Sequence, residues 1–236
     1  MEISLPRRQL VLSLLAVTAG GALLASCGED TPPQTPPGTP PTTPPASKVD
    51  VPPSQGTVDV AKLMADGALP EKVIGNAEAP VTIVEYASMT CPHCATFHAA
   101  TLPAIKEKYI DTGKARLIFR EFPFDPRAEA GFMLARCSEA NYFAMVDVLF
   151  KQQRTWASVE NARDALLQIA RLAGFSQESF EACLTNQKLL DDIRAVRARG
   201  ANDFKVEATP TFFINGAKYS GALSVDEMSA IIDSKL

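Results

Sequence analysis

The chain has 236 residues, of which 46% are hydrophobic and 21% charged, and its formal net charge is −4. This balance is typical of a globular protein with a sizeable core, and the length fits one domain with additions or two small domains. The slightly acidic charge and the lack of a long basic run argue against a nucleic-acid partner.

The first 26 residues indicate a signal peptide of the lipoprotein type. Arg7 and Arg8 precede an apolar run from Leu10 to Leu24. The run leads into Ala25-Ser26-Cys27, which resembles the bacterial lipoprotein cleavage box, where the cysteine becomes the first mature residue and carries the lipid. We therefore expect lipidation at Cys27, with an ordinary signal peptide or an uncleaved anchor as the alternative. The arginine pair fits ordinary export charge better than twin-arginine export, and the sequence leaves the export route open.

Residues 27–56 form a stretch dominated by proline and threonine, as in Thr31-Pro32-Pro33. Such a stretch has almost no apolar surface to bury, so it cannot offset the entropy of ordering. We expect an extended polyproline II linker which, at about 3.1 Å per residue, would hold the next domain up to roughly 90 Å from its anchor. A recognition role for the proline motifs is the weaker alternative.

The remaining residues, 57–236, contain patterns typical of a folded domain. Residues 58–64 indicate a short helix. Residues 80–86 are apolar and β-branched on both faces, which is typical of a central strand. A helix is predicted over 92–109, with a kink at Pro103, and a second strand over 115–120.

A long helical block is predicted over about 125–204, where no strand pattern appears. Apolar residues recur there at helical spacing from Ala162 to Leu172, and Gly174 follows as a stop signal. Residues 211–219 then form a predicted β-hairpin around the tight turn Asn215-Gly216. Ser224 and Glu227 form a capping box that opens a last helix, to about residue 235. The order predicts an α/β domain in which a helical insertion splits a small sheet.

Cys91-Pro92-His93-Cys94 stands where the first predicted strand gives way to a helix. The free N–H groups and the dipole of a helix N-terminus favour an anion, so the Cys91 thiolate should be stabilised. Pro92 suits the first helical turn because it lacks an N–H, and His93 is placed to stabilise the same thiolate. Cys94 lies one turn further and can close a disulfide with Cys91. Since a stabilised thiolate is a good leaving group, the motif predicts a redox-active disulfide that readily oxidises other thiols.

Two other interpretations of this motif are half of a zinc site and an inert structural disulfide. A structural zinc site needs four ligands, and the sequence has no second CxxC and no paired-histidine motif. The other histidine, His98, lies four residues after Cys94 on the same predicted helix, where a packing or surface role is expected. We therefore expect no metal and no cofactor.

The CxxC motif after strand 81–86, together with Thr209-Pro210 before the hairpin, resembles the DsbA family of the bacterial cell envelope. The resemblance covers about residues 70–236. It implies a thioredoxin fold with an inserted helical subdomain, with Cys91 as the exposed nucleophile and Cys94 as its buried partner. It also implies that Thr209-Pro210 forms a cis-proline loop facing the active site, and not a trans proline entering a strand. Thr209 departs from the valine of the prototype oxidase and matches related isomerases, which leaves the direction of electron flow open.

Glu85 is a charged residue inside an otherwise apolar strand, six residues before Cys91. A buried carboxyl at this place can exchange a proton with Cys94. The family resemblance implies a buried acid with that role. An edge-facing or salt-bridged glutamate is the alternative.

Two of the five cysteines, Cys137 and Cys183, remain once Cys27 is assigned to a lipid and Cys91 is paired with Cys94. Both lie in the helical block. In an oxidising compartment we expect them to form a structural disulfide. Two separately buried free thiols are the alternative.

These features together predict an extracytoplasmic thiol–disulfide oxidoreductase that forms disulfides in exported proteins. Its expected partners are exported proteins with cysteine thiols and a membrane redox partner. The domain should be a monomer, attached to a membrane and facing the periplasm or the exterior. A reductase or isomerase, and an envelope chaperone or antigen on the same fold, are the alternatives. The sequence does not identify the substrates, the redox partner, or whether the inner or outer membrane holds the lipid.

Overall fold

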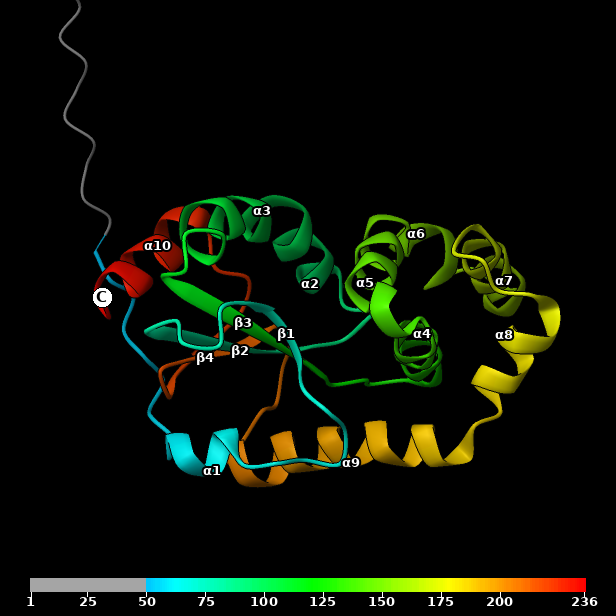
Figure 1. The fold of residues 1–236 in the computed structure, drawn as a ribbon, viewed down its shortest axis with the longest axis horizontal. Coiled ribbons are helices and arrows are strands. Elements are labelled where there is room, and N and C mark those ends of the chain that lie inside the picture. Colours follow the sequence, from blue (N-terminus) through cyan, green and yellow to red (C-terminus); the bar gives the residue numbers. More distant parts are fainter. Residues whose placement is uncertain (1–49) are drawn as a thin grey trace, which may run out of the picture. The chain divides into compact units, whose positions relative to one another are not determined.

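A five-stranded mixed sheet organises residues 50–236, the part of the chain that the computed structural model describes (Figure 1). The strands are β1 (Lys72–Gly75), β2 (Val81–Ala87), β3 (Ala115–Glu121), β4 (Thr211–Ile214) and β5 (Ala217–Ser220), in the spatial order β1-β3-β2-β4-β5. β2 and β3 pair in parallel, and the other neighbours are antiparallel. β2 lies at the centre, as its apolar faces predict.

The predictions for the N-terminal region fall largely outside the described residues. The signal peptide, Cys27 and the linker up to residue 49 all belong to the part that is not described. In residues 50–236, no helix is both long and apolar enough to cross a membrane.

Helices cover both faces of the sheet (Figure 1). One face carries α2 (Pro92–Thr96), α3 (Leu102–Ile105) and α10 (Val225–Asp233), and the other carries α1 (Val60–Met64) and α9 (Gln187–Phe204). The core of the first face includes Phe97, Tyr109, Phe212 and Ile231. The core of the second includes Leu63, Tyr86, Phe204 and Phe213.

The helix that follows the CxxC motif is irregular. α2 and α3 are each followed by a wide π-helical segment, Phe97–Thr101 and Lys106–Ile110, so that the whole runs from residue 92 to 110. The first wide segment comes just before Pro103, which has no N–H to continue the regular hydrogen-bond pattern. The predicted helix is therefore present, and its two wide segments lie on either side of Pro103.

The helical block lies between β3 and β4. It consists of α4 (Pro126–Cys137), α5 (Tyr142–Lys151), α6 (Gln153–Trp156), α7 (Ala162–Leu172) and α8 (Gln177–Leu184), with a 3-10 turn at Glu139–Asn141, and α9 leads back to the sheet. Its own core includes Phe132, Leu149, Trp156 and Phe180. Gly174 ends α7 with a φ of +93°. The architecture is thus α/β with a helical insertion, as predicted for about 125–204.

α9 crosses the sheet face closely enough to need a glycine at the contact. A Cβ added at Gly200 would lie 2.7 Å from the Cε1 of Tyr86. Nearby, the buried Arg120 of β3 donates to Glu71, to the Tyr86 hydroxyl and to the carbonyl of Leu63.

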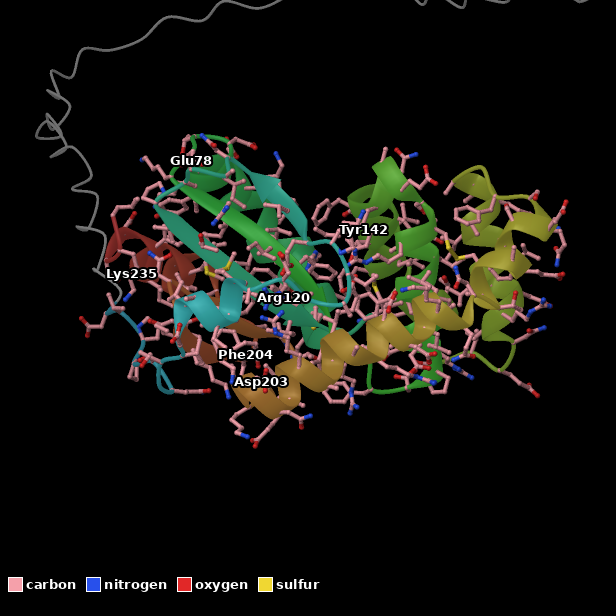
Figure 2. All side chains as sticks on the ribbon, turned by 60° about the horizontal axis from the view of Figure 1, so that its bottom comes forward. Glu78, Arg120, Tyr142, Asp203, Phe204 and Lys235 are labelled. Atoms are coloured by element: carbon pink, nitrogen blue, oxygen red, sulfur yellow. A yellow bond between two sulfur atoms is a disulfide. The ribbon has the colours of Figure 1, made fainter. Side chains whose placement is uncertain are left out.

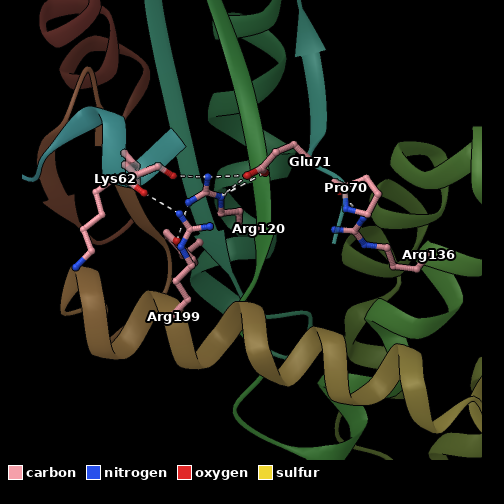
Figure 3. Close-up of polar contacts among 8 residues, drawn as sticks. Lys62, Pro70, Glu71, Arg120, Arg136 and Arg199 are labelled. Carbon is pink, nitrogen blue, oxygen red and sulfur yellow. Dashed lines mark hydrogen bonds and ion pairs between the residues drawn. The ribbon is translucent and has the colours of Figure 1, made fainter. Parts of the chain in front are cut away.

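These contacts join α1 and the segment before β1 to the sheet (Figure 3). Arg199 of α9 and Arg136 of α4 add bonds to the carbonyls of Lys62 and Pro70. In Figure 2, Arg120 lies on the sheet and Tyr142 lies at the start of α5 in the helical block.

The sheet contains one strand and one edge contact that the sequence pattern does not reveal. β1 is only four residues long, and its sequence contains no long apolar run. None of its residues is fully buried, since half-buried and exposed positions alternate along it. At the other edge, residues 55–58 pair with β5. The bonds are Gln55 N–H to the Lys218 carbonyl, Lys218 N–H to Gly56 and Val58 N–H to Gly216. The predicted domain boundary at residue 57 falls inside this pairing.

The hairpin and the last helix follow local sequence rules. Asn215 and Gly216 have φ values of +47° and +85°, which is the turn geometry that Asn-Gly favours. The capping box of Ser224 and Glu227 is present. α10 ends at Asp233, two residues before the predicted end, and α1 begins at Val60 because Asp59 caps it.

Candidate active site

The CxxC motif lies at the start of α2, four residues after β2 ends. Cys91 is the N-cap of the helix and Pro92 occupies its first turn, where no N–H is needed. Cys91 is half-buried and Cys94 is wholly buried, and neither is in a disulfide. The arrangement gives one accessible sulfur with a second one behind it.

The surroundings of Cys91 favour its thiolate. A hydrogen bond from the Cys94 thiol, together with Thr209 and the backbone N–H groups of His93 and Cys94, lowers the Cys91 pKa to about 5, against the opposing effect of burial. The backbone groups are the free donors of the helix N-terminus. The side chain of His93 is exposed, and its predicted part in stabilising the thiolate stays a prediction.

The loop before β4 faces Cys91. The Thr209–Pro210 peptide bond is cis, and the Cys91 thiol donates to the Thr209 carbonyl at 3.2 Å. The Thr209 hydroxyl is buried and has no hydrogen-bond partner among the described residues. An unpaired buried hydroxyl is costly, and this one can turn its proton to a Cys91 thiolate.

We expect Cys91 in the reduced protein to titrate near pH 5, as measured by the ultraviolet absorbance of the thiolate. The stability that this thiolate adds to the folded reduced form is complete above the ordinary thiol value of 9.0 and is lost as the pH falls through about 5. The free energy of unfolding of the reduced form, relative to that of the oxidised form, should therefore decrease as the pH falls through that range. Thr209→Val, which removes the spare donor, should move the titration upward. A Cys91 pKa near that of a free thiol would contradict this.

Cys94 has the opposite environment. Burial raises the pKa of its thiol well above the ordinary value, and the hydrogen bond to Cys91 and the charge of Glu85 act in the same direction. Cys94 therefore keeps its proton under conditions where Cys91 has lost its own. The two sulfurs are suited to different tasks, Cys91 to attack and departure and Cys94 to resolution.

Glu85 is fully buried in β2 and forms a pair with His98. The His98 Nε2 lies 3.1 Å from each of the two carboxylate oxygens. The structure therefore does not place Glu85 at a sheet edge, and it gives His98 a polar partner besides its packing. Sequence reasoning missed this pair because Glu85 lies in β2 and His98 in the helix after the CxxC motif, and no local pattern shows that these two side chains meet.

The helical block holds the loop that carries Cys91. The side-chain amide of Gln153 in α6 donates to the carbonyls of Met89 and Cys91, at 2.8 and 3.0 Å. The Thr90 hydroxyl donates to Asp125 at 2.6 Å, and Asp125 also caps α4. These positioning contacts carry no sequence signal, because a glutamine in a helical block is unremarkable.

Replacing Gln153 with Met should lower the stability of the domain by roughly 1–2 kcal/mol, since two partly buried carbonyls lose a donor. It should also slow disulfide exchange, because the Cys91 loop is less well held. Gln152→Met is the matched control, as its side chain bonds to no described residue. Chemical denaturation and exchange with oxidised glutathione measure the two effects. Equal behaviour of the two variants would contradict the anchoring role.

The remaining cysteines are joined. Cys137 at the end of α4 and Cys183 in α8 form a disulfide. It lies at the opposite end of α4 from Asp125, and so away from the catalytic loop. Within residues 50–236, no group of three or more His, Cys, Asp or Glu side chains is arranged to hold a metal ion.

Comparison with known proteins identifies several relatives. The family model described as thioredoxin matches residues 68–234. A Rickettsia felis protein named as a protein-disulfide oxidoreductase is 36% identical over 168 residues, which cover 70% of this chain and 60% of that protein. Disulfide bond formation protein D of Bacillus cereus is 29% identical, over 70% of this chain and 79% of its own. This chain thus spans less than two thirds of the length of its Rickettsia relative.

The crystal structure of Wolbachia pipientis alpha-DsbA1 is similar, with a TM-score of 0.68 and 36% identity, covering 73% of this chain and 94% of that one. The similarity takes in the sheet and the helical block together.

Proposed function

The chain belongs to the thioredoxin superfamily, as a DsbA-like member with an inserted helical subdomain, and on that premise we propose that it is an extracytoplasmic thiol–disulfide oxidoreductase. The observation that carries the proposal is the asymmetry of its two free cysteines. The pKa of the half-buried Cys91 is lowered to about 5, while that of the buried Cys94 is raised. A dithiol exchange reaction uses both properties at once, because it needs one sulfur that attacks and leaves as a thiolate and a second sulfur that resolves the mixed disulfide.

The proposed reaction proceeds through a mixed disulfide. A substrate thiolate attacks the Cys91 sulfur of the Cys91–Cys94 disulfide, and Cys94 leaves and takes up a proton. A second substrate thiolate then attacks the substrate sulfur of the mixed disulfide, and Cys91 leaves as a thiolate. The substrate gains a disulfide and the two cysteines gain two electrons and one proton on Cys94.

The cis-proline loop supplies a place for the substrate backbone. The Thr209 carbonyl already accepts from Cys91, so a chain bound beside the sulfur can pair with the same loop. The stabilised thiolate favours the reduced form of the pair, which makes the oxidised form an oxidant. We therefore propose disulfide formation in exported proteins, with a membrane redox partner that reoxidises the pair.

The decisive experiment measures two activities of the purified chain and its redox equilibrium with glutathione. Oxidation of a reduced model protein should be fast, insulin reduction should be weak, and the equilibrium constant with glutathione should favour the dithiol form of Cys91 and Cys94. Strong insulin reduction with the opposite equilibrium would instead make the protein a reductase or isomerase, which Thr209 is compatible with. Absence of both activities, together with no exchange with glutathione, would leave a binding protein on this fold.

We further propose that the domain works outside the cytoplasm on a lipid anchor and as a monomer. The predicted signal peptide, the lipidation motif at Cys27 and the proline-rich stretch of the sequence support this location. A second disulfide, between Cys137 and Cys183, suits an oxidising compartment.

Cys27→Ala should release the protein from membranes without altering its exchange rate, because the linker separates the anchor from the catalytic domain. Membrane fractionation with and without the change measures release, and Ser26→Ala serves as a control that keeps both a small residue and the cysteine. Full membrane association of the Cys27→Ala protein would indicate an uncleaved anchor.

A further inference from the structure

The pair formed by Glu85 and His98 has a geometry that the exchange reaction alone does not explain. Glu85 has no exposed surface, and its two oxygens share the His98 Nε2 at 3.1 Å. The His98 side chain keeps 7% of its surface exposed. The imidazole is thus largely buried but keeps a small contact with solvent, which Glu85 lacks.

The position of the pair relates it to Cys94. His98 follows Cys94 by four residues on the same helical stretch, so both lie on the same buried face of that stretch. The charge of Glu85 is one of the causes that raise the Cys94 pKa, which places the carboxylate within electrostatic range of the thiol.

The ring orientation is fixed by aromatic neighbours. The His98 ring packs against Phe150 with centroids 4.5 Å apart, and against the ring of Phe119 at 5.3 Å. Phe97 adds an edge contact at 5.7 Å. A histidine held only for packing would not need its Nε2 directed at both oxygens of a carboxylate.

The proton that Cys94 loses during disulfide exchange needs an acceptor and a path to solvent. When Cys94 resolves a mixed disulfide, its sulfur bonds to Cys91, the bond from Cys91 to the leaving sulfur breaks, and the leaving group departs as a thiolate. The proton of Cys94 must go to a base. Glu85 can accept it but, being fully buried, cannot pass it directly to water.

We propose that His98 is a positioning residue that holds the Glu85 carboxylate for Cys94 and relays the Cys94 proton from Glu85 to solvent. Nε2 accepts the proton from the Glu85 carboxyl while Nδ1 releases one to water, and the reverse path supplies Cys94 when it leaves. The inference rests on the proposed function and adds to it the route of the proton.

Rapid mixing of the reduced protein with oxidised glutathione separates the two steps. Alkylation and mass spectrometry follow the mixed disulfide at Cys91 and its resolution by Cys94. We expect His98→Gln to form the mixed disulfide at the parental rate and to resolve it about tenfold to a hundredfold more slowly, as for loss of a proton carrier. Since Gln keeps a donor for Glu85, the equilibrium constant with glutathione should change by less than about threefold.

Three further variants make the result specific. His98→Phe keeps the aromatic packing and should be as slow as His98→Gln. In a Glu85→Gln background, His98→Gln should have no additional effect on resolution. Thr101→Val is the matched control, since it removes a buried hydrogen bond from the same π-helical segment without touching Glu85, and it should resolve at the parental rate.

Parental resolution by His98→Gln or by His98→Phe would overturn the relay. So would additive effects of Glu85→Gln and His98→Gln. If the parent itself shows no exchange with glutathione, the proposed function fails instead, so the two failures are distinct.

A measurement on the unaltered protein keeps the test valid if the His98 variants do not fold. The 15N chemical shift of His98 Nε2 should differ between the disulfide and dithiol forms, because the Cys94 proton is absent in one of them. An identical shift in both forms would overturn the inference.

Discussion

Cys94→Ser is expected to accumulate mixed disulfides between Cys91 and exported proteins, whereas the parent protein is expected to release such adducts rapidly. In the proposed mechanism the buried Cys94, which is hydrogen-bonded to Cys91, can attack the Cys91 sulfur and expel the substrate from a mixed disulfide. A well-oriented neighbouring group acts at a very high effective concentration, so its loss should slow resolution roughly a hundredfold or more. The low pKa of Cys91 keeps the attacking sulfur ionised at neutral pH, so capture itself should continue.

Non-reducing electrophoresis of envelope extracts, followed by mass spectrometry of the adducts, tests this expectation. Cys91→Ser should form no adducts and should abolish exchange, because it removes the nucleophile. The Cys91→Ser, Cys94→Ser double variant should behave in the same way. Adducts that form on Cys94 when Cys91 is absent, or none on Cys91 when Cys94 is absent, would contradict the assigned roles.

The largest effect on stability should come from the second disulfide. The Cys137–Cys183 bond joins residues 46 apart in sequence, and the chain-entropy model gives such a loop roughly 4 kcal/mol of stabilisation. Cys137→Ala together with Cys183→Ala should lower the free energy of unfolding by about that amount. Because the bond lies at the end of α4 remote from Asp125, exchange by the folded protein should stay near the parental rate.

Chemical denaturation of oxidised parent and double variant measures the loss, and alkylation before and after reduction counts the free thiols. Cys137→Ala alone is a useful control, since it should cost nearly as much as the double change. An exchange rate that falls in proportion to stability would show that the helical block transmits strain to the catalytic loop.

Local rules in the sequence predict a large part of this fold. The two-sided apolar run of β2 identifies the central strand, and Asn215-Gly216 identifies the hairpin, because each pattern depends on a few adjacent residues. β1 escapes prediction since it is short and forms only by pairing with β3. Its four residues are too few to show an alternation of apolar and polar side chains in the sequence.

The candidate site likewise has one part that adjacent residues predict and another part that depends on long-range contacts. Cys91, Cys94 and their place at a helix start can be read from adjacent residues. The partnership of Glu85 with His98 and the anchor from Gln153 join elements that are distant in sequence, so only the folded arrangement brings them together. The sequence shows that Glu85 is an unusual residue for its strand, but it cannot show which side chain pairs with the Glu85 carboxylate.

Residues 55–58 also decide what the sheet presents to other molecules. A strand at the end of a sheet offers a row of unpaired backbone groups to which a foreign chain can add. Here the segment that leads into the domain occupies part of that row on β5, through the pairing around Gly56 and Lys218. An open sheet edge can therefore template the association of extended polypeptides. By covering part of β5 with its own leading segment, the chain limits strand addition at this edge of the sheet.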